Sequence, residues 1–63
     1  MDGKLVTTRD AAAILCVSMA FLERDRWAGA RIPFVKIGDR VVRYRVEDLK
    51  AYIASRVKQS TSA

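Results

Sequence analysis

Basic side chains gather in one stretch of the sequence, and they are its best candidates for chemistry. Residues 31–45 contain five basic residues and one acidic residue, a net charge of +4, whereas the whole chain carries +5. These six residues are Arg31, Lys36, Arg40, Arg43, Arg45 and Asp39. Concentrated positive charge favours a polyanionic partner such as a nucleic acid. The alternative is that basic residues on exposed strands only prevent aggregation.

Catalytic chemistry is poorly supported by the other residues. The chain has no histidine, one cysteine and three glycines, so it lacks a histidine base, a glycine-rich phosphate loop and the usual zinc ligands. Glu47 and Asp48 are adjacent, which sets their side chains about 100° apart on a helix and disfavours an acid–base pair. We therefore expect no enzyme activity, no cofactor and no metal site.

Three more side chains have two interpretations each. Cys16 could be a reactive thiol, but a small apolar residue between two helices is the favoured interpretation. Tyr44 and Tyr52 could stack on bases, although their spacing fits core packing better. A single cysteine cannot form an internal disulfide, which is compatible with a reducing cytosol.

The first half of the sequence predicts two short helices joined by a tight turn. Thr7 is a good N-cap for the first helix, and Asp10 resembles the acidic member of a capping box. The residues expected on the buried face of this helix are Ala11, Ala12, Ile14 and Leu15. Ser18 caps a second helix, predicted from Met19 to about Trp27, with Val17 spaced to pack on Leu22. Gly29 is the expected left-handed residue that ends it.

The second half predicts a β-hairpin and a third helix. Strands are expected at Phe34–Ile37 and Arg40–Tyr44, joined by a two-residue turn at Gly38-Asp39. In that register one face holds Val35, Ile37, Val42 and Tyr44, and the other holds Lys36 and Arg43. The same register places Arg40 on the apolar face, so a longer or bulged loop stays open. The residues with helical spacing after the hairpin are Val46, Leu49, Tyr52, Ile53 and Val57.

These elements indicate a small α+β fold, a winged helix-turn-helix with two N-terminal helices, a two-stranded β-hairpin wing and a C-terminal helix. A chain of 63 residues suffices for one domain, spanning 1–63 and ordered from about 5 to 58, with a flexible tail at 59–63. A domain of this size buries only about 60% of its unfolded surface, so we expect marginal stability. No apolar run approaches the ~20 residues of a membrane span, and a signal peptide is not expected, which favours a cytoplasmic protein.

A helix-turn-helix places the start of its second helix in the major groove of DNA. The outer face of that helix is expected to hold Met19, Ala20, Glu23 and Arg24, with Arg26 or Trp27 further along. Arg24 is the candidate for a guanine or a phosphate, and Glu23 could accept from a cytosine or hold Arg24 in place. Met19 and Ala20 could touch thymine methyl groups or indicate weak sequence readout. The near-neutral run from Glu23 to Arg26 supports weak readout.

The remaining candidate DNA contacts lie at helix starts and on the wing. Thr8 and Arg9 could bind a phosphate at the start of the first helix, and Ser18 stands at the start of the second. The wing candidates are Lys36, Asp39, Arg40 and Arg43, acting on the backbone or in the minor groove.

Together these residues resemble the small winged-helix proteins of the excisionase type, which share a fold with the DNA-binding domain of MerR-like regulators. The stretches that carry the resemblance are Leu5–Ala12, Leu15–Ser18, Gly29–Pro33, Val35–Gly38, Arg43–Arg45 and Asp48–Ile53. The resemblance implies a bacterial or phage-encoded, nucleoid-associated recombination directionality factor. Such proteins bind and bend attachment-site DNA and direct an integrase, a tyrosine or serine recombinase, toward excision. Some relatives instead regulate transcription of prophage genes.

The turn and the second helix each depart from the excisionase pattern. The turn usually has glycine where this chain has Cys16, so the turn must hold a left-handed residue or shift its geometry. The second helix usually has apolar residues where this chain has Asp25 and Arg26, and Trp27 is expected to fill that gap.

The expected partners are double-stranded DNA, an integrase and further copies of the chain. A single module contacts only about 600–1,000 Å² of DNA surface, so we expect cooperative self-association on adjacent sites. The alternative from another class is a small protein-interaction module whose basic hairpin docks an acidic partner.

Overall fold

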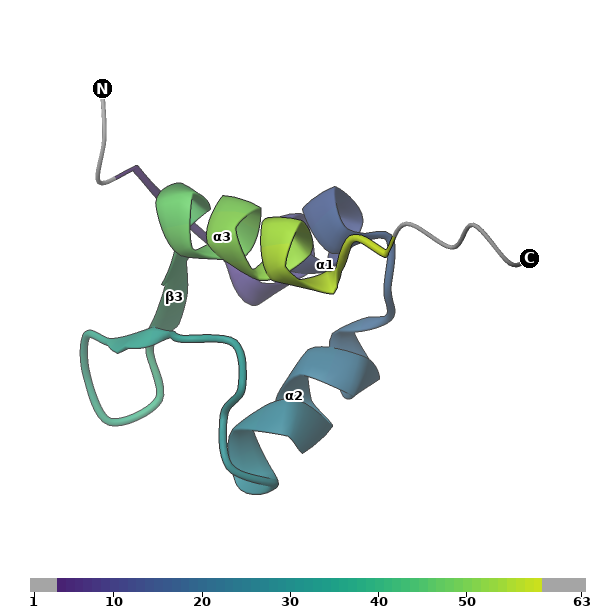
Figure 1. Cartoon of the computed structure of the whole chain (residues 1–63). Helices are drawn as coiled ribbons and strands as arrows, with labels where there is room; N and C mark the ends of the chain where they lie inside the picture. The colour runs from purple at the N-terminus through teal and green to yellow at the C-terminus, as the bar shows by residue number, and fades with distance from the viewer. Residues whose placement is uncertain (1–3, 59–63) are drawn as a thin grey trace.

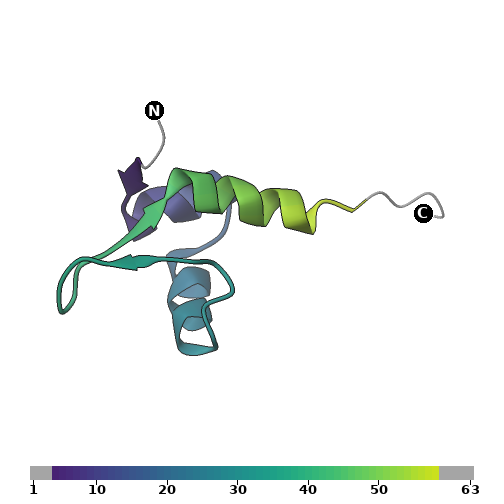
Figure 2. The same ribbon diagram turned by 60° about the vertical axis from the view of Figure 1, so that its left-hand side comes forward.

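The computed structural model describes residues 4–58, which form three helices and three short strands. Their order is β1 (Leu5–Val6), α1 (Thr8–Leu15), α2 (Met19–Trp27), β2 (Val35–Lys36), β3 (Val42–Arg45) and α3 (Val46–Arg56). In Figure 1, α3 lies across α1, and α2 stands apart from α3. Figure 2 shows the β2–β3 hairpin projecting beyond the helices. The predicted winged helix-turn-helix is confirmed, whereas the predicted flexible tail at 59–63 lies outside the described residues.

Both predicted N-caps of the helix-turn-helix are formed. The hydroxyl of Thr7 accepts a hydrogen bond from the backbone N–H of Asp10 at 3.1 Å, and that of Ser18 accepts one from Phe21 at 3.0 Å. Each bond satisfies an N–H group that has no partner inside its helix. Among residues 4–58 the Asp10 carboxylate makes no return bond to Thr7, so the capping box is only half closed.

The turn between α1 and α2 is built on a left-handed cysteine. Cys16 has φ 59° and ψ 41°, and its N–H donates to the carbonyls of Ala12 and Ala13. Val17 then donates to Ala12 at 2.9 Å, which closes the turn. Of the two geometries left open, the left-handed residue is the one observed. Cys16 lies between the two helices as predicted, but its side chain is exposed and does not pack there as a small apolar residue.

The end of α2 contains two residues with positive φ. Gly29 was expected there and has φ 120°, while Ala30, which follows it, has φ 53°. The N–H of Ala30 donates to the carbonyl of Asp25 at 2.7 Å, so this hydrogen bond ties the left-handed residue to the last turn of the helix.

The sheet has three strands in the order β1-β3-β2, all antiparallel. The prediction of a two-stranded hairpin missed β1, which is only two residues long and pairs Leu5 with Arg45 and Val6 with Tyr44. The N–H of Val46 donates to the carbonyl of Lys4 at 3.0 Å. The start of the chain therefore anchors the junction where β3 passes directly into α3.

The hairpin register differs from the predicted one by one residue. Val35 pairs with Arg43 and Lys36 pairs with Val42, and the N–H of Ile37 donates to the carbonyl of Val41 at 2.8 Å. The loop is therefore longer than the predicted two-residue turn at Gly38-Asp39. A shift of one residue moves a strand's side chains to the opposite face. Lys36 accordingly shares a face with Val42 and Tyr44, and the prediction that it shares one with Arg43 is wrong.

The core lies where the three helices meet β3. Its fully buried members are Ala11, Ala12, Leu22, Ile32, Tyr44 and Leu49. Val6, Leu15, Val17, Phe34, Val42 and Tyr52 pack around them. Three expected core residues, Ile14, Ile53 and Val57, are exposed instead. No helix within residues 4–58 is long and apolar enough to cross a lipid bilayer.

Candidate nucleic-acid interface

Helix α2 is held against the core by one apolar residue and two charged ones. Leu22 is fully buried, and the Asp25 carboxylate accepts a hydrogen bond from the backbone N–H of Ile32 at 3.1 Å. Arg26 donates to the hydroxyl of Tyr44 at 2.9 Å and to that of Thr8 at 3.5 Å. These contacts determine which face of α2 is left for a partner.

The charged residues Asp25 and Arg26 explain a departure from the excisionase pattern. Trp27 does not fill the gap left by missing apolar residues; its side chain is 91% exposed. The Arg26 guanidinium lies 5.9 Å from the ring of Phe34, which in turn lies 6.4 Å from the ring of Tyr44. Arg26 therefore faces the sheet, so of the two residues expected further along the outer face, Arg26 or Trp27, only Trp27 is exposed there. The spacing of four residues between Leu22 and Arg26 could have indicated the orientation of Arg26, because such residues share a helix face.

The outer face of α2 holds the four candidate contacts predicted from the sequence. The four side chains, all exposed, are Met19, Ala20, Glu23 and Arg24. Among residues 4–58 neither Glu23 nor Arg24 makes an ion pair. This face is therefore nearly neutral, with an apolar tip and one available guanidinium.

A groove separates the end of α2 from the wing. Its volume is about 500 Å³, and its lining includes Trp27 and Arg26 on one side and Lys36, Asp39 and Arg40 on the other. The observed register produces this groove, because it places Lys36 on the face that bears Val42 and Tyr44. The groove contains three cations and one anion, so its net charge is positive.

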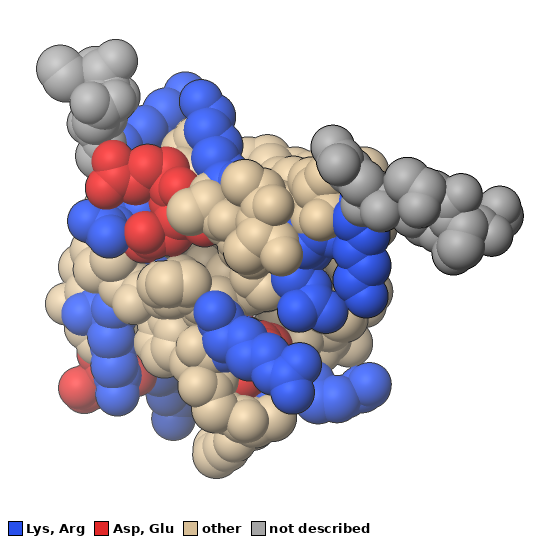
Figure 3. All heavy atoms as spheres, viewed as in Figure 1, with Lys and Arg blue, Asp and Glu red and all other residues tan. Residues whose placement is uncertain are grey.

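The fifth basic residue of the 31–45 stretch is neutralised locally. The Arg45 guanidinium donates to both carboxylate oxygens of Asp48, at 2.7 and 2.9 Å, and lies 3.2 Å from Glu47. The hydrogen bond to Asp48 raises the pKa of Arg45 above its ordinary value. Figure 3 shows acidic side chains gathered over the start of α3, and basic side chains spread over much of the remaining face. Within residues 31–45 the charge that is not paired with a carboxylate therefore lies on the wing and the loop that precedes it.

The other predicted contacts do not lie together. Arg43 is on the opposite face of β3 from Tyr44, and its guanidinium donates to the carbonyl of Val42 at 2.8 Å. Arg9 is exposed at the start of α1, whereas the hydroxyls of Thr8 and Ser18 accept intramolecular hydrogen bonds. Thr8 is thereby linked to the groove through Arg26.

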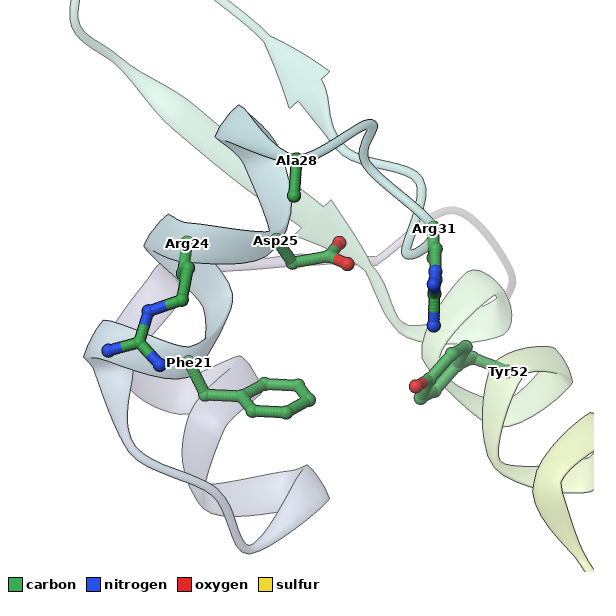
Figure 4. Close-up of a pocket in the computed structure, with 6 residues that line it drawn as sticks. All are labelled: Phe21, Arg24, Asp25, Ala28, Arg31 and Tyr52. Carbon is green, nitrogen blue, oxygen red and sulfur yellow. The ribbon is translucent and has the colours of Figure 1, made fainter.

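A second hollow lies on the other flank of α2, between α2 and α3, and was not predicted. Figure 4 shows the rings of Phe21 and Tyr52 pointing toward one another across it, with Arg31 beside Tyr52 and the Asp25 carboxylate directed inward. Its volume is about 240 Å³, and Arg56 lies 5.9 Å from the Tyr52 ring. This size suits one apolar side chain. In residues 4–58 no three His, Cys, Asp or Glu side chains lie close enough to hold a metal ion.

Comparison with protein-family models gives one match, to a family described as a helix-turn-helix domain, over residues 5–57. The comparisons with curated proteins and with solved structures gave no match. The matched range includes α1, α2, the wing and α3, and so covers every element that forms the two hollows.

Proposed function

The chain belongs to the helix-turn-helix domain family and binds double-stranded DNA, and from this premise we propose that it is an excisionase-like factor. In this role it binds and bends attachment-site DNA and directs a tyrosine or serine integrase toward excision of a phage or mobile element. The family includes excisionase-like DNA-binding proteins. The observation that supports this role best is the contrast between a nearly neutral α2 and a positively charged wing groove.

That contrast favours binding through the DNA backbone and its shape. A repressor that reads bases needs several polar side chains on the reading helix, each bonded to a base edge. Here Arg24 is the one exposed cation among the four outer residues of α2, and Met19 and Ala20 offer only apolar contacts. Contacts to phosphates position a protein but carry no sequence information. An architectural role therefore fits this surface better than a base-reading one.

Most of the contacts we propose lie on α2 and on the β2–β3 wing. On α2, Arg24 binds a guanine or a phosphate while Glu23 orients it. On the wing, Lys36, Asp39 and Arg40 face one DNA strand and Arg43 faces the other, because a hairpin inserted in the minor groove has a strand on each side. The remaining proposed contacts are those of Thr8, Arg9 and Ser18 to phosphates beside α1 and α2, and those of Met19 and Ala20 to thymine methyl groups.

Cooperative binding follows from the size of this surface. A single module of this kind buries about 600–1,000 Å² on DNA, which is small for a specific site. We therefore propose that several copies bind adjacent sites. A probe carrying several sites should show steeper binding than a probe carrying one. Independent filling of the sites would contradict this part of the proposal.

Binding to DNA is tested by a gel shift with attachment-region DNA at increasing salt. Affinity should fall steeply, because each lysine or arginine that neutralises a phosphate adds about 0.9 to the slope of log K against log salt. The double variant Arg24→Ala with Arg40→Ala should lose most of the binding. Lys50→Ala with Lys58→Ala, which removes equal charge from exposed positions outside both hollows, is the matched control.

The excision role needs a separate assay. Purified protein, integrase and a substrate with two attachment sites should give excised circles only when the protein is present. Bending is tested with probes of equal length that carry the binding site at different positions. If the gel mobility of the protein–DNA complex depends on that position, the DNA is bent. If the protein instead represses a reporter without stimulating excision, it is a transcription regulator of the mobile element.

One observation favours the alternative of a protein-interaction module, namely the hollow between Phe21 and Tyr52. Its aromatic walls and the neighbouring Arg24 and Arg31 would accept an apolar side chain from an acidic segment. If the Arg24→Ala and Arg40→Ala changes leave DNA binding intact but release a bound protein, that alternative is the correct one.

A further inference from the structure

Trp27 is the most exposed large apolar side chain in residues 4–58, at 91%. It is the last residue of α2 and the only tryptophan in the chain. Its neighbour Arg26 binds Tyr44 and Thr8 without it, and the core closes around other residues. The indole therefore contributes little to folding.

The position of Trp27 indicates what covers it. Single exposed apolar residues are common and need no explanation. This one, however, borders the groove that also holds Lys36 and Arg40. Within residues 4–58 neither of these two cations forms an ion pair, and Asp39 is the one acidic residue of the groove lining. The occupant of such a groove should combine regularly spaced negative charge with flat or apolar surface.

The sugar–phosphate strand of DNA has this combination. Its phosphates match the ammonium and guanidinium groups of the wing, and the carbon atoms of its deoxyribose rings present apolar surface to an aromatic ring. An acidic protein segment is the competing occupant. DNA is favoured because α2 is the second helix of a helix-turn-helix, so its exposed side faces the duplex.

We propose that Trp27 is a DNA-contacting residue, whose indole packs against the strand that fills the groove between α2 and the wing. This inference rests on the proposed DNA-binding function and adds to it an apolar contact at the end of α2. Lys36 and Arg40 bind phosphates and so position the strand in the groove, and the indole then covers its deoxyribose surface.

The single tryptophan makes the proposal directly measurable. A fluorescein-labelled mixed-sequence duplex at low salt reports binding by anisotropy, and acrylamide quenching of the tryptophan emission reports exposure of the indole. We expect strong quenching in the free protein and several-fold weaker quenching at saturating duplex. This measurement needs no variant, so it holds even if a substitution at position 27 disturbs the fold.

Two variants extend the test. Trp27→Ala should weaken binding roughly tenfold, the order expected when a large apolar side chain loses its burial, while Trp27→Phe keeps most of the affinity. The salt slope should stay unchanged in both, because no phosphate contact is lost. Val57→Ala, at an exposed apolar residue on the far end of α3, is the matched control and should bind like the parent.

The outcomes separate this proposal from the proposed function. If anisotropy shows binding while quenching stays the same, the Trp27 contact is refuted and DNA binding stands. If an integrase protects the indole and the duplex does not, the groove is a protein contact and the proposal is refuted. Absence of any binding to the duplex at low salt would overturn both.

Discussion

The hydrogen bond between Arg26 and Tyr44 offers the sharpest test of how α2 is held. Tyr44 is fully buried, and its hydroxyl accepts from the Arg26 guanidinium at 2.9 Å. A hydrogen bond to a charged group contributes about 1.5–3 kcal/mol, and water replaces part of this because Arg26 is only half-buried. We therefore expect Tyr44→Phe to lower the free energy of unfolding by about 1.5 kcal/mol. For a domain of 60–100 residues this corresponds to a fall in Tm of roughly 6–12 °C.

The assay is thermal and urea unfolding followed by circular dichroism. Tyr52→Phe is the matched control, because its hydroxyl makes no hydrogen bond within residues 4–58, and its stability should change by less than about 0.5 kcal/mol. Combining Tyr44→Phe with Arg26→Met in a double-mutant cycle should give a coupling energy of about 1 kcal/mol or more. Equal stability of the Tyr44→Phe and Tyr52→Phe proteins would refute the assignment of this bond as an anchor of α2.

Three further substitutions test the turns. Cys16→Gly should stabilise the protein by about 0.5–1 kcal/mol, because glycine adopts φ 59° without steric cost, and calorimetry should show the higher Tm. Ser18→Ala should destabilise it by about 1 kcal/mol through loss of the α2 cap, with a lower urea midpoint at an unchanged m-value. Gly29→Ala should destabilise it by about 1 kcal/mol or more in the same urea titration, because alanine is strained at φ 120°. An unchanged midpoint for Gly29→Ala would show that this turn adjusts its backbone freely.

The elements that were predicted correctly have local causes. Thr7 and Ser18 cap helices through bonds to residues three positions later, so their signal lies within one turn of sequence. The bounds of α2 were correct for the same reason: a cap precedes it and a glycine follows it shortly after its last residue.

The incorrect predictions concern contacts between distant residues. The faces of the hairpin depend on pairing Ile37 with Val41, one residue away from the pairing that a Gly-Asp turn suggests. Arg26 finds its partner 18 residues later in Tyr44, and a charged residue in the last turn of a short helix does not reveal which distant residue it bonds. Trp27 was expected either on the outer face of α2 or in the packing gap at Asp25 and Arg26, and only the first holds, because charged residues with tertiary hydrogen bonds occupy that gap.

The sequence predicted which residues belong to the candidate interface, but not how they are arranged in space. The exposed face of α2 follows from helical periodicity once its buried residues are known. The groove lined by Lys36 does not follow from periodicity, because it depends on the pairing register of the two hairpin strands. Arg45 was counted as free charge, but its carboxylate partners lie two and three residues further along the chain, at the start of α3. The residues proposed to contact DNA remain predictions for the binding assays above.

The direct passage of β3 into α3 has a mechanical consequence. No residue intervenes between Arg45 and Val46, and the junction is bonded to Lys4, so the base of the wing has no hinge. The wing is therefore joined to α3 without a flexible linker. A duplex that contacts the wing and α2 at once and does not match their spacing would itself have to deform, at a cost of order 1–6 kcal/mol for bends of 40–90°. Sequences that deform easily would be selected at base pairs that no side chain touches.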